Sequence, residues 1–349
     1  MWFISLLFSI VCCLPVGYQL LAVHDPVVSG HLPVVMSDRK GMTHLVYGQD
    51  SIIYYAVTGH SSSAFSGPIA VATLPQLVAG AKRGPQLAVT EKYIVITAVN
   101  RLGDLFSYSL DRETGRWSPA ARINDVPEIA KEGFQAVVGT TANTFHATWL
   151  DLREDGHNKI VMATSHDGGR TWSANRVVYR SPSGTVCECC KVSIAANNND
   201  VYIQFRNWVD GCRDLYLARS TNGGASFAPI QKLGVGTWKV NACPMDGGMV
   251  TLSGKGQPLT VWRRENTLYS CRPGESEQPI AVGRNVTAAA NASDTALAWD
   301  ENGIVWLKLN TNKPVALGKG QMPSVTVSKT TAICAWEVDG QVKTASLSF

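Results

Sequence analysis

A chain of 349 residues that is 45% hydrophobic and 17% charged can bury a large core, so its composition excludes a disordered or low-complexity protein. The formal net charge is +4, and the lysines and arginines are scattered along the chain. Because a nucleic-acid-binding surface needs a dense basic patch, the sequence predicts no nucleic-acid partner.

The first 23 residues differ in composition from the rest of the chain. Residues 2–17 read WFISLLFSIVCCLPVG, without Lys or Arg, and the first charged side chain is Asp25. An apolar run of about 15 residues is short for a bilayer span. We therefore expect a signal peptide over residues 1–23, with cleavage near Ala22, and a single domain over residues 24–349. The mature protein would be secreted or periplasmic, with no stable membrane insertion.

An internal repeat organises the remaining chain. Residues 162–178 (MATSHDGGRTWSANRVV) align with residues 217–233 (LARSTNGGASFAPIQKL), which places Trp172 and Phe227 55 positions apart. Weaker copies at 55–71 and 108–123 contain Phe65 and Trp117. A repeat of this length indicates one supersecondary unit per copy.

A second recurring feature extends the repeat to the end of the chain. Short apolar strands end in an aromatic residue followed by polar residues, at Tyr47, Trp149, Phe205, Trp262, Trp299 and Trp336, with a weaker copy near 97–100. Another short strand precedes each of them. Seven such units of about four strands predict an all-β chain folded as a seven-bladed β-propeller, with six blades as the alternative. The last unit lacks one strand, and residues 25–31 (DPVVSGH) would supply it and close the ring.

The stretch SHDGGRTW, residues 165–172, resembles the Asp box of sialidases and of the wider superfamily of bacterial neuraminidase repeat (BNR) propellers. Residues 220–227 (STNGGASF) are a degenerate copy. The resemblance implies that the box joins the third and fourth strands of a blade, on the face opposite the active site. Asp167 is expected to accept hydrogen bonds from turn amides, and Trp172 to pack between blades, so both have structural roles.

The reactive residues are expected on the opposite face, in the loops after the second strands and in the links between blades. The sialidase resemblance implies arginines that clamp a substrate carboxylate and an Asp that acts as acid or base. The family's first clamp arginine has no counterpart in HLPVVMSD (31–38), so the sialidase catalytic set is incomplete. The candidates for binding an acidic sugar and donating a proton are Arg206, Arg213, Arg263 and either Asp151 or Asp246.

Five cysteines converge on this same face if the chain is a propeller: Cys187, Cys189, Cys190, Cys212 and Cys243. One interpretation is one or two disulfides that staple long loops in an oxidising compartment. The other is a soft-metal site for copper or zinc, because thiolates are their preferred ligands. Cys271 and Cys334 fall in other strands and are expected to be buried in the core.

Two functional hypotheses follow. In the first, the protein is an exported glycoside hydrolase, sialidase-like in scaffold, that recognises an acidic sugar in a carbohydrate or glycoconjugate and needs no cofactor. In the second, it is a non-catalytic propeller that binds glycan, protein, or copper or zinc through the cysteine-rich face. The sequence leaves open whether the protein is an enzyme.

Overall fold

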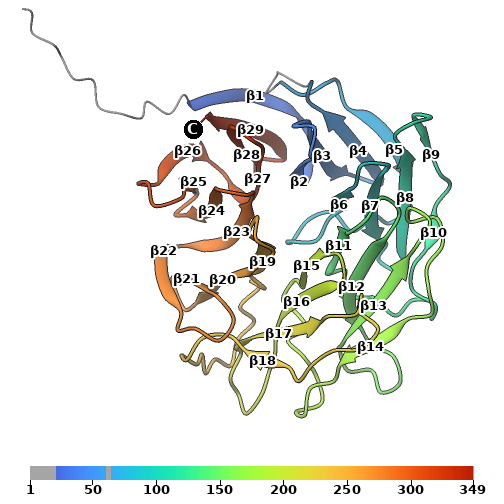
Figure 1. Cartoon of the computed structure of the whole chain (residues 1–349), viewed down its shortest axis with the longest axis vertical. Helices are drawn as coiled ribbons and strands as arrows, with labels where there is room; N and C mark the ends of the chain where they lie inside the picture. Colours follow the sequence, from blue (N-terminus) through green and yellow to red (C-terminus); the bar gives the residue numbers. More distant parts are fainter. Residues whose placement is uncertain (1–20, 60–63, 349) are drawn as a thin grey trace, which may run out of the picture.

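The computed structural model describes residues 21–59 and 64–348. Within these residues every regular element is a β-strand, and the strands form seven antiparallel sheets arranged as blades in a ring (Figure 1). The prediction of a seven-bladed β-propeller is confirmed. No helix in the described part of the chain is long and apolar enough to cross a membrane.

Each blade takes its strands in chain order from the channel outward. The first blade consists of β2 (His31–Ser37), β3 (Thr43–Gln49), β4 (Ile52–Val57) and β5 (Ile69–Thr73). The second consists of β6 (Gln86–Val89), β7 (Tyr93–Val99), β8 (Leu105–Asp111), β9 (Arg116–Trp117) and β10 (Ala121–Arg122). The third consists of β11 (Gln135–Gly139), β12 (Phe145–Asp151), β13 (Lys159–Ser165) and β14 (Arg176–Tyr179). The fourth blade consists of β15 (Ser193–Asn197), β16 (Asp200–Arg206), β17 (Leu215–Ser220) and β18 (Gln231–Lys232). The fifth consists of β19 (Met249–Leu252), β20 (Pro258–Arg264), β21 (Thr267–Cys271) and β22 (Gln278–Val282). The sixth consists of β23 (Arg284–Ala290), β24 (Thr295–Glu301), β25 (Ile304–Leu309) and β26 (Val315–Lys319).

The seventh blade joins the two ends of the chain. It contains β27 (Gln321–Val327), β28 (Thr331–Val338), β29 (Gln341–Ser348) and, outermost, β1 (Leu21–Ser29). β1 pairs antiparallel with β29, with Leu21 opposite Leu347, so the strand before the first unit closes the ring as expected. β1 begins within the predicted signal peptide, and the rest of that segment, residues 1–20, lies outside the described residues.

The core lies between neighbouring blades and is organised by the recurring aromatic residues. All six are at most 3% exposed, and they occupy the second strand of their blades: Tyr47, Trp149, Phe205, Trp262, Trp299 and Trp336. Hydrophobic clusters cross from one blade to the next, as in the cluster that joins β24 and β25 to β27, β28 and β29. The repeat found in the sequence is therefore the repeat of the interblade core.

The turn at Ser165–Ser173 joins β13 to β14, the third and fourth strands of the third blade. The carboxylate of Asp167 accepts hydrogen bonds from the backbone amides of Arg170 and Thr171 at 3.1 and 2.9 Å. It also accepts the hydroxyls of Ser165 and Thr171 at 2.8 and 2.7 Å. All four bonds stay within the turn, so Asp167 has the structural role predicted for it. We call Ser165–Ser173 the Asp-box-like turn.

The same turn fastens its blade to the previous one. Gly168 has a φ of +79°, and a Cβ placed on it would lie 2.6 Å from the ring of Tyr93 in β7, so only glycine fits. The indole Nε1 of Trp172 donates a 2.9 Å hydrogen bond to the Ser107 hydroxyl in β8. The interblade packing predicted for Trp172 is thereby confirmed.

Candidate functional site

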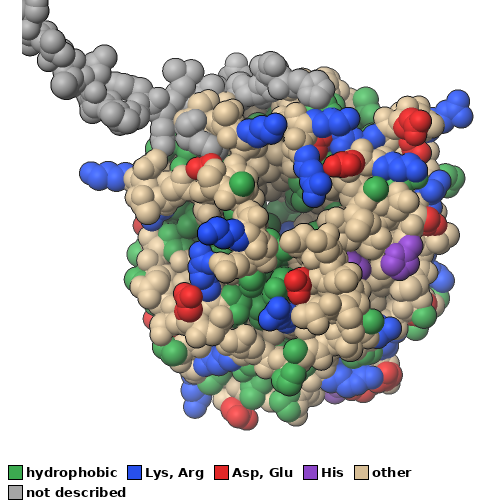
Figure 2. Space-filling view, viewed as in Figure 1, with side chains coloured by type: hydrophobic (Ala, Val, Ile, Leu, Met, Phe, Trp, Pro, Cys, Tyr) green, Lys and Arg blue, Asp and Glu red, His purple; other side chains and the backbone are tan. Residues whose placement is uncertain are grey.

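The two faces of the ring follow from strand alternation. The Asp-box-like turn lies at the end of a third strand, and we call its side the turn face. The loops after the second strands and the links between blades lie on the other side, which we call the link face. Figure 2 shows a face of the ring with a central hollow and with Lys and Arg side chains around it. The channel itself contains a cavity of about 220 Å³, lined by the first strands of all seven blades.

The position directly after the buried aromatic is charged in four successive blades: Arg206 in β16, Arg263 in β20, Asp300 in β24 and Glu337 in β28. We call these residues the charged arc. Three of them hydrogen-bond to the backbone of the next blade, at Arg263, Met322 and Leu32. The arc therefore joins the fourth blade to the fifth, the sixth to the seventh and the seventh to the first.

Arg206 is 1% exposed, and protein carbonyls take up its donors. Its Nε donates to the carbonyl of Asp246 at 2.9 Å, and its two terminal nitrogens donate to the carbonyls of Arg213 and Arg263 at 2.5 and 2.8 Å. A carboxylate clamp needs two parallel N–H groups that face the ligand. The guanidinium of Arg206 holds three segments of the link face together and presents no such pair.

Arg263 and Asp246 form a buried ion pair. Their exposed fractions are 4% and 5%, and Nε of Arg263 lies 3.4 Å from Oδ2 of Asp246. A terminal nitrogen of Arg263 donates to the Pro244 carbonyl at 2.8 Å. Burial lowers the pKa of Arg263, and the Asp246 charge opposes that shift. The ring of Trp238 lies 5.3 Å from the guanidinium of Arg206 and 5.4 Å from that of Arg263.

Two carboxylates at the channel mouth share one bridging residue, Asn285. Its backbone amide donates to Oδ2 of Asp246 at 3.0 Å, and its side-chain amide donates to Oδ1 of Asp300 at 2.6 Å. Asn285 has a φ of +55°, which turns its backbone and side-chain donors toward the two acids. Burial raises the pKa of Asp300, although the hydrogen bonds from Asn285 and Met322 act in the opposite direction. Both acids are buried, but their environments differ: Asp246 forms an ion pair with Arg263, whereas Asp300 forms none with any described residue.

Two cations complete the channel mouth. Burial lowers the pKa of Lys82, with Asp246 opposing the shift, and its ammonium donates to the Met245 carbonyl. Arg284 is exposed and forms no ion pair among the described residues. Arg284 and Asp300 line a cavity of about 700 Å³ between the fifth, sixth and seventh blades. Lys82 and Asp246 line the channel cavity. Each cavity is therefore lined by both positively and negatively charged side chains.

Asp151 is fully buried, with 0% exposure, and lies apart from this group. Its carboxylate accepts the indole N–H of Trp149 at 2.8 Å. It also accepts the backbone amide and the guanidinium of Arg153, at 2.9 and 2.7 Å. These contacts lie within its own blade and lock the loop after β12. Arg213, in contrast, is half-buried over the ring of Trp208 and donates to the sulfur of Cys187 at 3.0 Å.

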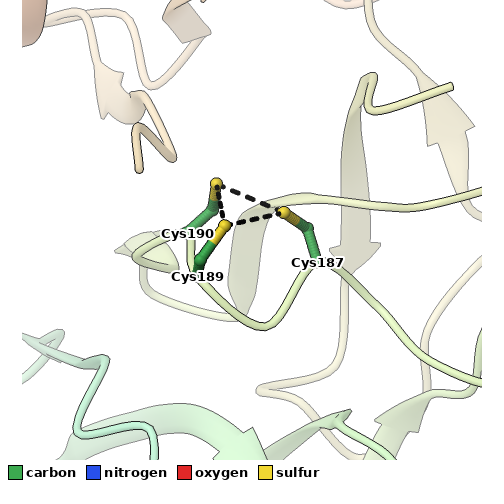
Figure 3. Close-up of side chains that lie close together, drawn as sticks. All are labelled: Cys187, Cys189 and Cys190. Atoms are coloured by element: carbon green, nitrogen blue, oxygen red, sulfur yellow. Dashed lines mark hydrogen bonds between the residues drawn. The ribbon is translucent and has the colours of Figure 1, made fainter. Parts of the chain in front are cut away.

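Four of the five predicted cysteines come together in the links, and Figure 3 shows three of them, Cys187, Cys189 and Cys190. Cys189 and Cys243 form a disulfide that ties the link before β15 to the link before β19. The sulfurs of Cys187, Cys189 and Cys190 lie within 4.8 Å of one another, a group that can hold a metal ion. Cys212 is half-buried and belongs to neither the disulfide nor this group. The predicted disulfide and the predicted sulfur cluster are both present, and they share Cys189.

The thiols of Cys187 and Cys190 lie 3.3 Å apart, and both are 1% exposed. The hydrogen bond between the two thiols and the charges of Arg213 and Arg206 lower the pKa of Cys187 to about 6, against the effect of burial. Burial raises the pKa of Cys190 well above its usual value. Cys187 is therefore the more acidic thiol of the pair.

Sequence reasoning did not select Lys82, Arg284, Asn285 or Asp300. The repeat contains a signal for three of them, Arg284, Asn285 and Asp300. The first strands of the first, sixth and seventh blades open with Gly-X-Y, at residues 30–32, 283–285 and 320–322, and Y has a positive φ in each case. The amide of Y donates to a carboxylate: Glu337, Asp246 and Asp300, respectively. Aligning these three starts would have pointed to the acids at the channel mouth.

Comparison with known proteins supports the fold. No protein-family model and no curated protein matches the chain. Among solved structures, an ulvan lyase of a polysaccharide lyase family, bound to a GlcA(1-4)Rha3S saccharide, is similar with a TM-score of 0.59 and 11% identity over 93% of this chain and 95% of that one. The β-propeller domain of the Trilobed protease from Pyrococcus furiosus has a TM-score of 0.55 and 12% identity, over 92% and 96% of the two chains.

A lectin is also similar. The SapL1 lectin in complex with alpha methyl fucoside has a TM-score of 0.53 and 10% identity, over 84% of this chain and 98% of that one. Identities this low establish the β-propeller and nothing about activity. The sialidase resemblance therefore rests on residues 165–172 and their degenerate copy at 220–227.

Proposed function

We propose that this protein is an exported glycan-active hydrolase, secreted or periplasmic, that acts on an acidic saccharide at the channel mouth of the link face. The observation that carries the proposal is the pair of unlike carboxylates, Asp246 and Asp300, held by the single residue Asn285. Glycoside hydrolysis generally needs one protonated and one ionised carboxyl group. Burial of Asp300 and the ion pair of Asp246 provide that difference.

The proposed roles follow from these environments. Asp300, whose pKa is raised, donates a proton to the oxygen of the glycosidic bond. Asp246, which forms an ion pair with Arg263, stabilises the positive charge that develops on the sugar. Asp246 and Arg263 thus remain from the set predicted by sequence. Asp151 and Arg206 do not form part of the proposed site, because each is at most 1% exposed and lines neither cavity.

The cations at the channel mouth suit an acidic substrate. Arg284 is exposed at the wall of the larger cavity and has no carboxylate partner among the described residues, so its guanidinium is available for a substrate carboxylate. Lys82 adds a second positive charge on the channel side. That propellers of the same fold include an ulvan lyase and a fucoside-binding lectin is consistent with a glycan ligand.

The test is turnover of a panel of fluorogenic uronides and sialosides and of uronate-containing oligosaccharides. Asp300→Asn should lower kcat by about 100-fold or more, because it removes the proton donor. Arg284→Ala should mainly raise KM. Asp214→Asn is the matched control, since Asp214 has the same 8% exposure as Asp300 but lies in the fourth blade, outside both cavities. Absence of turnover of every acidic substrate by folded protein would contradict the proposal.

A second candidate function is soft-metal binding, by copper or zinc, on the same face. The observation that favours it is the group of three sulfurs within 4.8 Å, next to the guanidinium of Arg213. Thiolates are the ligands that copper(I) and zinc prefer. Metal analysis of the purified protein, before and after reduction of its disulfide, tests this candidate directly.

A further inference from the structure

The cysteine cluster consists of Cys187, Cys189, Cys190 and Cys243, and these four residues differ sharply in their exposure to solvent. Cys243 is exposed and Cys189 is half-buried, whereas Cys187 and Cys190 are buried. The sulfur of Cys189 lies 3.6 Å from that of Cys187 and 3.9 Å from that of Cys190. The disulfide is therefore the solvent-facing part of the cluster, and the two thiols lie on its protein side.

We propose that the Cys189–Cys243 disulfide is a redox gate on a copper(I) site made of Cys187, Cys189 and Cys190. This inference rests on the second candidate function, soft-metal binding, and adds the condition under which the metal binds. In the oxidised protein Cys189 shares its sulfur with Cys243 and cannot act as a thiolate ligand. Only reduction supplies the third thiolate. The disulfide and the metal site are then two successive states of one cluster.

The gate opens by ordinary thiol–disulfide exchange with a low-molecular-weight thiol. A thiolate attacks the exposed sulfur of Cys243, forms a mixed disulfide and releases the Cys189 thiolate. A second thiol then attacks the mixed disulfide and releases Cys243. Two external thiols are oxidised to one disulfide, and the two electrons reduce Cys189 and Cys243. Attack at Cys243 is favoured because that residue is the exposed end of the bond.

The number of sulfurs favours copper(I) over zinc. The group within 4.8 Å contains three cysteines, and it includes neither Cys243 nor Cys212. Structural zinc requires four ligands in a tetrahedral arrangement, whereas soft thiolates select copper(I) without that requirement. A three-sulfur group with buried thiols therefore fits copper(I) better.

The surroundings compensate the negative charge that three thiolates carry. Arg213 donates to the sulfur of Cys187 at 3.0 Å. Arg206, which is buried beside the links, acts electrostatically on both Cys187 and Cys190. Because a copper(I) ion neutralises only one of three thiolate charges, two nearby guanidinium groups stabilise the loaded cluster. Two of the three arginines predicted to clamp a sugar, Arg206 and Arg213, thus stabilise the sulfur site.

The experiment is an anaerobic copper(I) titration in competition with bathocuproine disulfonate. It compares untreated protein with protein reduced by dithiothreitol and desalted. We expect reduced protein to bind one copper(I) per chain at least 100-fold more tightly than untreated protein. Cys243→Ser should bind copper(I) tightly without reduction, because its Cys189 is always free. Cys187→Ser should lose tight binding in both states, and Cys212→Ser, the matched control, should behave as the unmodified protein.

The possible failures are distinguishable. Equal tight binding by untreated and reduced protein would overturn the gate and leave the metal site. No tight binding by reduced protein or by Cys243→Ser, with tryptophan fluorescence showing that both are folded, would overturn the metal site as well. Tight binding by reduced protein that is lost in Cys243→Ser would overturn the three-sulfur assignment in favour of four ligands. Cys243→Ala serves in place of Cys243→Ser if the latter does not fold.

Discussion

The turn face and the link face both carry many polar groups, but the partners of these groups lie at very different distances along the chain. On the turn face, Asp167 bonds to residues two to four positions away. On the link face, Arg206 bonds to carbonyls 40 and 57 positions away, and the Cys189–Cys243 disulfide spans 54 positions. Because the hydrogen bonds of Asp167 join near neighbours in the chain, the turn has a recognisable sequence motif, and this motif indicates the fold. Polar groups that join several blades hold a site whose parts have no fixed spacing in the sequence.

The largest effect should come from breaking a long-range contact on the link face. Arg206→Met leaves three carbonyls without their donor, two of them in buried hydrogen bonds, and should lower the free energy of unfolding by about 4 kcal/mol. Urea unfolding followed by tryptophan fluorescence measures the change. The control is Arg219→Met in the same blade, whose exposed ion pair with Asp200 should contribute less than about 1 kcal/mol. A similar small loss in both variants would remove the contrast between the faces.

Acid should weaken the turn-face end of the third blade. Burial lowers the pKa of His146 from 6.5 to about 4, so its neutral form is the one that the fold accommodates. Stability is complete above pH 6.5 and falls as the pH drops toward 4, because the unfolded chain takes up a proton first. The loss reaches about 3 kcal/mol near pH 4. Urea unfolding at pH 7.5, 5.5 and 4.5 should show this slope, reduced in His146→Gln. His44, whose pKa is also lowered by burial, accounts for part of the remainder.

The Asp-box-like turn should respond as a structural element only. Asp167→Ala removes the acceptor of two backbone amides and should destabilise the protein by about 2 kcal/mol, measured by urea unfolding. Glycan turnover and copper(I) binding should not change at temperatures where the variant is folded. Loss of either activity in the folded variant would place chemistry on the turn face.

The smallest effect should come from restoring the degenerate copy of the turn. Asn222 accepts the amide of Ser226 at 2.9 Å and the hydroxyl of Ser220 at 2.8 Å, as Asp167 does in its own turn. Asn222→Asp makes these bonds charge-assisted and should raise stability by about 0.5 kcal/mol. Thermal unfolding is sensitive enough to detect the change. A decrease in stability would mean that the two turns are not equivalent.

The fold was predictable because it repeats. Trp149, Trp299 and Trp336 are each buried in the second strand of a blade, so the number of such aromatic positions in the sequence indicates the number of blades. The convergence of Cys187, Cys189 and Cys243 also followed from topology, since links of neighbouring blades share a face. Which sulfurs pair was not predictable, because it depends on loop conformations that topology leaves free.

The chemistry of the charged residues was harder to predict. Arg206 and Asp300 occupy the same position in their blades, yet backbone carbonyls take up the donors of the first, while the second lines a cavity. The difference arises from the neighbouring backbone, such as the positive φ of Asn285, which turns its donors toward two acids. Residue type and strand position alone do not contain that information.

The pairing of β1 with β29 places the first described strand beside the last one, with Leu21 opposite Leu347. A chain made from its amino terminus can complete six blades before the partner of β1 exists. Contacts between residues so far apart form slowly, and until they form the edge of β28 or β29 is open to pairing with other chains. Assembly of the ring is therefore complete only after β29 has been made, and the chain must be protected from aggregation until then.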